Sequence, residues 1–495
     1  MKRNAAALMM AVTTLAVTLP STLAGPATKV LKAGAATSNI TPPLGLGLVG
    51  GWNVRPATHV HDELHVRCLA LDDGSTVLAF AVIDNLGVPR EVLDEAKKLV
   101  HSETGLPIGQ MLMSATHTHR AASARGQSAN PAESPLDDYQ RFLVRRIADG
   151  VRRALNNLEP ARIGWGAGQV PQHVFNRRWL LKDGRTSPNP FGGQDRAVMN
   201  PGGDRNQLLK PAGPTNSEVY FVSIQSTAGR PIALLANYWL HYVGPAAPDG
   251  WVSADYFAAF CDRIQGLLGA DRLDPPFVGI LANGPCGDVN NIDYSGRTPA
   301  RKHAPFEKIR VVADDLAQEV VRVHKTIEFR DWVELRAAAR DLTLRLRRPS
   351  AELIARAEKI LAQPVTASPV HMREVEYAKR TLAARHWPES VDVVLQTFAI
   401  GGLAIAAIPF EVFTETGLEI KARSPFKDTF TIELANGSYG YLPTPEQHAL
   451  GGYETWLGTN RVEVEASRMI TTVILGLLEE LAGSRSASEL RTPAR

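Results

Sequence analysis

The sequence is poor in cysteine, with only Cys68, Cys261 and Cys286 in 495 residues. An odd and sparse set of this kind excludes a fold stapled by disulfides, so a hydrophobic core has to supply the stability. Long runs of one charge are also lacking, and 54 basic residues nearly balance 51 acidic ones. This balance argues against a nucleic-acid partner, which a basic stripe would mark.

Long apolar stretches are absent after the amino terminus, and a bilayer span needs about 20 such residues. The amino terminus has Lys2 and Arg3, then an apolar run over 5–19, then small residues up to Ala24. This pattern is typical of a secretory signal peptide. We therefore expect residues 1–24 to be a signal peptide and the mature protein to be secreted or periplasmic. It would have no transmembrane span, while peripheral contact with a membrane stays open.

Internal repeats and breaks in composition are missing as well, so one large domain is expected. Short apolar segments typical of strands buried on both faces alternate with amphipathic segments typical of helices. The alternation predicts an α/β fold with a mixed, largely parallel sheet layered with helices. The predicted strands are 77–83, 110–114, 232–240, 277–281 and 403–408, and the predicted helices are 90–102, 137–157, 254–268 and 306–323.

The catalytic domain is expected over residues 30–482, followed by a flexible tail over 483–495. Within the domain, the charged segment 350–385 predicts an inserted helical hairpin, most simply a solvated surface element. The segment 183–217 is crowded with glycine, proline, asparagine and aspartate. It is too long for an ordinary connection, which leaves a functional loop or a disordered one.

Ionisable residues repeatedly follow the carboxyl-terminal ends of the predicted strands. They are Asp84, His117, His241, Asp288 and Glu411. In open α/β sheets this edge is where ligands bind, because the loops converge there. A buried imidazole or carboxylate is costly unless it has a partner. A bound metal ion would satisfy several of these groups at once.

His117 and His119 are two residues apart, which in an extended chain places both imidazoles on one side. Taken alone, such a pair more often bonds the backbone at the start of a loop, and a single His241 is more often a core histidine. Glu411 follows an apolar strand, where a carboxylate either caps a helix or serves a site. Together, two histidines and a carboxylate with an open position form a standard catalytic zinc set.

Short motifs occur in a fixed order along nearly the whole chain. They are S-A-T-H-T-H at 114–119, N-R at 176–177, Y-W-L-H at 238–241 with S-A-D-Y at 253–256, G-D-V at 287–289, P-F-E at 409–411 and G-Y at 440–441. Each motif is short, but their ordered combination resembles the neutral ceramidase family. Little chain remains after residue 478, so the carboxyl-terminal immunoglobulin-like domain of longer family members has no counterpart here.

The resemblance implies a set of site residues. Zinc would be held by His117, His241, Glu411 and Tyr441, while His119, Arg177, Asn290 and Tyr441 would contact the reacting groups. His119 suits a proton shuttle, and Tyr441 or Arg177 suits oxyanion stabilisation. Asp84, Asp255 and Asp288 would lie in the surrounding shell, where Asp84 and Asp288 could orient ligand imidazoles. A purely structural role for Asp84 stays open.

The predicted function is that of a zinc-dependent hydrolase, which cleaves the N-acyl amide bond of a ceramide-like lipid with water that the metal activates. Two departures from the family leave alternatives open. Asn290 stands where the family has a serine, and Arg120 adds a positive charge after the second histidine. The substrate could therefore be another amide or ester, or the protein could be a ligand-binding descendant without catalysis.

Overall fold

The computed structural model describes residues 29–126, 135–182, 184–202, 205–244, 248–297, 301–364 and 369–489, and side chains as far as residue 483. The predicted signal peptide and residues 490–495 lie outside these ranges. The helix that ends the described chain continues to Glu489, past residue 483 where the tail was predicted to begin. In the described ranges, no helix combines the length and apolar character that a membrane crossing requires.

Eight strands form the larger sheet, in the order β19-β17-β16-β9-β1-β5-β6-β7. Their bounds are β1 Lys32–Asn39, β5 His65–Asp72, β6 Val77–Ile83, β7 Met111–Ala115, β9 Glu159–Gln169, β16 Glu218–Ser226, β17 Pro231–Tyr238 and β19 Val278–Asn283. Only the end pairs, β17 with β19 and β6 with β7, are parallel. The other pairs are antiparallel. The sheet is mixed, as predicted, but the expectation of a largely parallel sheet is wrong.

A second sheet of four strands packs face to face on the first. It contains β21 Leu335–Arg345, β22 Ser390–Ile400, β23 Leu403–Ile408 and β25 Asp428–Glu433 in that order. The ring centroids of Phe80 and Phe398 lie 5.2 Å apart across the interface. Val222, Ile405 and Phe430 belong to the same buried core. Both sheets therefore share one apolar layer, which holds the chain together without disulfides.

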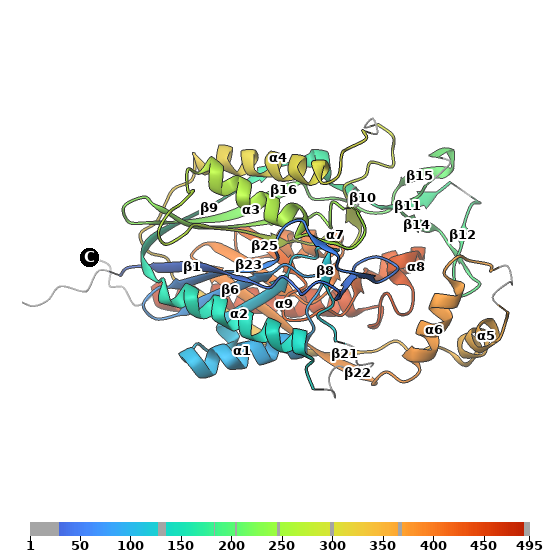
Figure 1. Ribbon diagram of the computed structural model, residues 1–495. Helices are drawn as coiled ribbons and strands as arrows, with labels where there is room; N and C mark the ends of the chain where they lie inside the picture. Colours follow the sequence, from blue (N-terminus) through green and yellow to red (C-terminus); the bar gives the residue numbers. More distant parts are fainter. Residues whose placement is uncertain are drawn as a thin grey trace, which may run out of the picture.

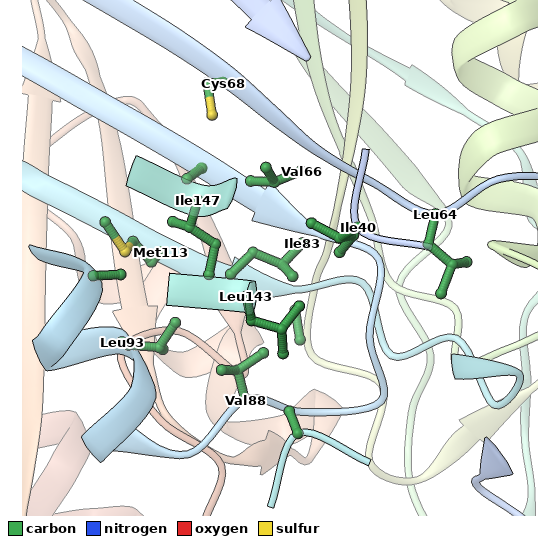
Figure 2. Close-up of a cluster of buried hydrophobic side chains, with 14 of the residues drawn as sticks. Ile40, Leu64, Val66, Cys68, Ile83, Val88, Leu93, Met113, Leu143 and Ile147 are labelled. Atoms are coloured by element: carbon green, nitrogen blue, oxygen red, sulfur yellow. The ribbon is translucent and has the colours of Figure 1, made fainter. Parts of the chain in front are cut away.

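Helices cover the outer faces of both sheets, which gives four layers (Figure 1). On the larger sheet these are α1 Arg90–Thr104, α2 Asp138–Asn156, α3 Asp255–Leu267 and α4 Glu307–His324, and on the smaller sheet α7 Thr414–Arg423 and α9 Ala466–Glu489. Figure 2 shows Leu143 and Ile147 of α2 packed with Val66, Ile83 and Met113 of the larger sheet. The four predicted helices are confirmed to within a few residues at their ends.

The predicted helical hairpin is also confirmed, as α5 Ala351–Leu361 and α6 Glu374–Ala384 between β21 and β22. It is more than a solvated surface element, because α6 buries Tyr377, Ala378 and Thr381. The hydroxyl of Tyr377 hydrogen-bonds that of Thr459. In Figure 1 the two helices stand apart from the layers, at the end of the molecule where α8 and β12 lie.

The segment 183–217 is not structureless in its described parts. Two of its strands extend β11 into a small sheet, and two more pair as a hairpin. These elements are β11 Arg178–Leu181, β12 Ser187–Pro188, β13 Gln194–Asp195, β14 Ala197–Met199 and β15 Leu208–Pro211.

Short elements make up the remaining connections and gather the site. They are β2 Gly47–Val49, β3 Arg55–Pro56, β4 His59–Val60, β8 Ala121–Ala122, β10 Phe175–Asn176, β18 Trp251–Val252, β20 Val289–Asn290, β24 Glu411–Val412, β26 Tyr441–Leu442, α8 Pro445–Leu450, and the 3-10 turns η1 Ile108–Gln110, η3 Pro171–His173, η4 Arg205–Gln207 and η5 Tyr453–Thr455. β10 pairs with β20, and β24 pairs with β26. These two pairs contain three of the predicted site residues, Asn290, Glu411 and Tyr441, and Arg177 directly follows β10.

Candidate metal centre

His117 lies two residues beyond the end of β7, in a left-handed backbone conformation that residues other than glycine seldom adopt. Its φ is 72°, and its N–H donates to the carbonyl of Asn85. The segment from His117 to His119 is therefore turned rather than extended, contrary to the expectation from the sequence. Strain of this kind persists only where the surroundings hold it, and it is concentrated at functional sites.

The turn brings three imidazoles together. His117 Nε2 lies 3.0 Å from His241 Nε2 and 3.3 Å from His119 Nε2. The other ring nitrogen of His117, Nδ1, lies 2.6 Å from the carbonyl of Leu86, and that of His241 lies 3.3 Å from the carbonyl of Cys286. Because a carbonyl only accepts, both Nδ1 atoms carry the proton. Both Nε2 atoms therefore turn a lone pair toward each other.

The Glu411 carboxylate completes this arrangement. Its Oε2 lies 3.4 Å from His117 Nε2 and 3.9 Å from His241 Nε2. The same oxygen is buried and has no hydrogen-bond partner in the described part of the chain. Three lone pairs that converge in a buried space repel one another unless a cation lies between them. The residues present thus fit a metal ion. The ring nitrogens of His117, His119 and His241 that could bind such an ion all lie within 4.8 Å of one another.

The local charges favour a positive charge at this point. Burial lowers the pKa of His117, but the facing Glu411 carboxylate outweighs burial, and the pKa is raised. Burial and the neighbouring His117 hold the pKa of His241 well below its usual range. For Glu411, burial acts to raise the pKa, yet His117 and a hydrogen bond from Tyr441 lower it. Glu411 is therefore an anion, and it favours a positive charge at or beside the His117 nitrogen that it faces.

Tyr441 and Arg177 border the centre on the side of β26. The Tyr441 ring lies parallel to that of His241, with centroids 6.5 Å apart. The Arg177 guanidinium lies 5.3 Å from the centre of the Tyr441 ring. Arg177 Nε also donates to Glu454 over 2.9 Å, and Arg178 contacts the second oxygen of the same buried carboxylate. The single negative charge of Glu454 thus faces the two positive charges of Arg177 and Arg178. A net positive charge therefore remains beside Tyr441.

His119 faces a small pocket. It has a volume of about 160 Å³, and its lining includes Gly50, His119, Arg120 and Tyr242. The His119 ring stacks on Tyr242 with centroids 3.6 Å apart. Arg120 Nη1 donates to the carbonyl of Pro248 over 2.9 Å, so this guanidinium also fixes the loop that closes the pocket.

Asn290 lies near the centre, but other protein groups occupy its side chain. Its Nδ2 donates to Asn200 over 2.7 Å, and its Oδ1 accepts from the N–H of Ile292 over 2.9 Å. Tyr294 also hydrogen-bonds this amide. The asparagine therefore ties two loops together, whereas a serine hydroxyl would reach fewer partners at this position.

None of the three predicted outer carboxylates hydrogen-bonds an imidazole in the described structure. Asp84 accepts from Arg67 and from the N–H of His65. Asp255 accepts from three backbone N–H groups around the loop after His241. Asp288 accepts from Asn176 and Thr414. The expectation that Asp84 and Asp288 orient the ligand histidines is corrected, because backbone carbonyls hold these rings and the carboxylates fix loops.

The sequence did not point to two residues that position other groups of the candidate centre. Glu433 ends β25 and accepts from the N–H groups of Val412 and Cys286 over 2.8 and 3.2 Å. It thereby fixes the residue after Glu411 and the carbonyl that holds His241. Glu433 is the last residue of a strand with the sequence D-T-F-T-I-E, which lacks the continuous apolar run that marked the other site residues. The second missed residue, Glu454, lies in a 3-10 turn and gave no such signal.

The layers and the histidine cluster define an α/β protein with a candidate metal centre at the end of its sheets. In a comparison with solved structures, this fold is similar to that of two ceramidases. A crystal structure of neutral ceramidase from Pseudomonas aeruginosa superposes with a TM-score of 0.69 at 14% identity, over 92% of this chain and 74% of that one. A ceramidase complexed with C2 gives 0.68 at 14% identity, over 92% and 76%. The fold expected from the ordered motifs is thereby confirmed.

No protein family model matches the chain, and no curated protein does. At 14% identity the structural likeness concerns the fold. The chemistry therefore has to be argued from the residues of the centre itself.

Proposed function

We propose that this protein is an exported zinc-dependent hydrolase, with its catalytic domain over residues 30–482, which cleaves the N-acyl amide bond of a ceramide-like lipid. The observation that carries the proposal is the convergence of His117 Nε2, His241 Nε2 and Glu411 Oε2 with no partner for the carboxylate oxygen. Two imidazoles and a carboxylate suit zinc, which takes nitrogen and oxygen ligands and can accept a fifth ligand during catalysis. Tyr441 is the proposed fourth ligand.

The chain's own residues divide the work around the cleaved bond. A zinc ion held there would polarise the substrate carbonyl and lower the pKa of a water molecule from 15.7 to about 7. Arg177 and the Tyr441 hydroxyl supply positive charge and a donor where the carbonyl oxygen gains negative charge. His119 Nε2 borders the same space, so it can receive a proton and pass it to the leaving amine.

Asn290 takes no part in the bond chemistry of this proposal. Its amide is engaged with Asn200 and Ile292, and an amide cannot form an acyl intermediate. Water is therefore the nucleophile. The same centre would also act on a different amide or on an ester, and the lining of its pockets then decides the substrate.

The test is a screen of N-acylated lipids, simple amides and simple esters with purified protein, before and after chelation and after zinc is added back. We expect turnover of an N-acyl lipid that chelation abolishes and zinc restores, and about one zinc per chain. The His117→Ala variant should bind no zinc and show no turnover. Full turnover by metal-free protein would refute the proposal, and bound zinc with no turnover of any substrate would favour the ligand-binding alternative.

A further inference from the structure

Two segments far apart in the sequence meet beside the metal centre. One is the loop over 50–55 and the other is the segment over 369–375, which leads into α6 of the inserted hairpin. The Arg373 guanidinium lies 3.7 Å from the centre of the Trp52 ring. Trp52, Met372 and Arg373 also line one pocket of about 380 Å³. The two segments therefore form opposite sides of one opening.

Both segments carry apolar side chains that are exposed to water. The exposed fractions are 42% for Trp52, 66% for Val54, 62% for Val370, 80% for Met372 and 50% for Val375. These five residues are called the rim below. Single exposed apolar residues are ordinary, but a group of them on two contacting segments marks a binding surface.

The pocket inside the rim runs toward the metal centre. Its lining includes Tyr453, whose ring centroid lies 5.7 Å from that of Tyr441, and Asn200, which bonds Asn290. Trp456 adds another aromatic wall, with its N–H directed to the Asp195 carboxylate. The Tyr453 ring thus contacts both Trp52 of the rim and Tyr441 of the candidate centre.

The composition of the rim favours a lipid surface over a folded partner. A tryptophan next to an arginine is typical of the boundary between lipid and water, where ring and guanidinium reach both phases. The carboxylate of this segment is turned away, because Glu374 is buried and paired with Arg356. The hairpin also stands apart from the layers in Figure 1.

We infer that the rim docks the protein on a lipid bilayer and places the opening of the pocket at the membrane surface. The inference rests on the proposed function, because a two-chain substrate has to leave its bilayer to reach the centre. Docking itself needs only the apolar side chains, so it does not depend on zinc.

The test compares two triple variants in sedimentation with phosphatidylcholine vesicles. One carries Val54→Asp, Val370→Asp and Val375→Asp, which change the rim but not the pocket lining. The control carries Ile108→Asp, Phe142→Asp and Val464→Asp, at exposed apolar positions outside the rim. We expect the rim variant to bind vesicles about tenfold more weakly than the wild type, since binding follows the apolar area inserted. The control and His117→Ala should bind like the wild type.

Measurements of turnover distinguish the docking inference from the proposed catalytic function. The rim variant should lose about tenfold in turnover of a long-chain N-acyl lipid embedded in vesicles, and it should keep full turnover of a water-soluble short-chain amide. Vesicle binding that depends on the rim, with no turnover of either substrate, would refute the proposed function and leave docking standing. Equal binding by wild type and rim variant, or a rim variant that converts a dimer into a monomer, would overturn the docking inference.

Discussion

Glu411 and Tyr441 lie directly opposite each other on the paired parallel strands β24 and β26, and the Tyr441 hydroxyl helps to lower the pKa of the Glu411 carboxylate. Their backbones are linked as well, since Glu411 N–H donates to the carbonyl of Gly440. Two residues thirty positions apart are thus fixed as one unit. The unit faces His117 and His241, which come from the other sheet.

The first prediction concerns the charge of this unit. Glu411→Gln keeps the shape of the side chain but replaces the unpartnered oxygen and its negative charge. We expect zinc affinity to fall by more than about 100-fold, because changes in the outer shell alone cost about 10–100-fold. Zinc content by mass spectrometry and the melting temperature check this, with Glu419→Gln on the exposed face of α7 as the control. A variant that retains zinc would remove Glu411 from the ligand set.

The second prediction concerns the asparagine in the serine position. Asn290→Ala removes the link to Asn200 but no group that takes part in bond cleavage. Turnover should therefore drop less than about tenfold, and the free energy of unfolding should fall by about 1 kcal/mol. Asn291→Ala is the matched comparison, because its amide holds the carbonyls of Tyr242 and Val243 directly after His241. Abolished turnover in Asn290→Ala alone would show an essential role for this amide.

The five predicted strands all have a parallel neighbour, although β25, which pairs in parallel with β23, was not predicted. Five continuously apolar segments correspond to β6, β7, β17, β19 and β23, and each of these pairs with a parallel strand. Strands with only antiparallel neighbours escaped notice because their composition is mixed. β9 carries three glycines, and β21 carries three arginines on a partly exposed face. A search for apolar runs therefore overestimates the parallel share of such a sheet.

At the site, the sequence indicated the residues but not the groups that hold them. Strand ends and ordered motifs pointed to His117, His241 and Glu411, which the structure brings together. The acceptors for the imidazoles are backbone carbonyls of Leu86 and Cys286, and a carbonyl exists at every position. No sequence pattern distinguishes the ones that matter. Their positions follow from the fold of two loops, which is a property of tertiary packing.

The third prediction concerns the buried carboxylate that joins two arginines. Glu454→Gln leaves the charges of Arg177 and Arg178 uncompensated in the interior. Breaking a buried pair in this way costs about 3–5 kcal/mol, so the free energy of unfolding in urea should fall by that amount. Glu446→Gln, which breaks an exposed contact with Arg468, should cost less than about 1 kcal/mol. Similar losses in both variants would contradict this account of the buried cluster.

The last prediction concerns Lys97, a buried residue of α1. Its Nζ donates to Asn436 over 2.7 Å, and burial lowers the pKa of Lys97 to about 8 from a usual 10.5. Below pH 8 the lysine is charged in both states, so the folded state bears the full cost of burying the charge. As the pH rises from about 8 to about 10.5, the folded protein loses this proton while the unfolded chain keeps it, and stability rises by about 3 kcal/mol.

Lys97→Met removes this titration and fills the same space. The difference in the free energy of unfolding between wild type and Lys97→Met should therefore change with pH above 8, in the direction that favours the wild type as the pH increases. Lys98→Met is the control, because Lys98 is exposed and pairs only with Glu95. Urea unfolding at several pH values measures both differences. A pH-independent difference for Lys97→Met would show that the buried amine keeps its proton through a partner stronger than Asn436.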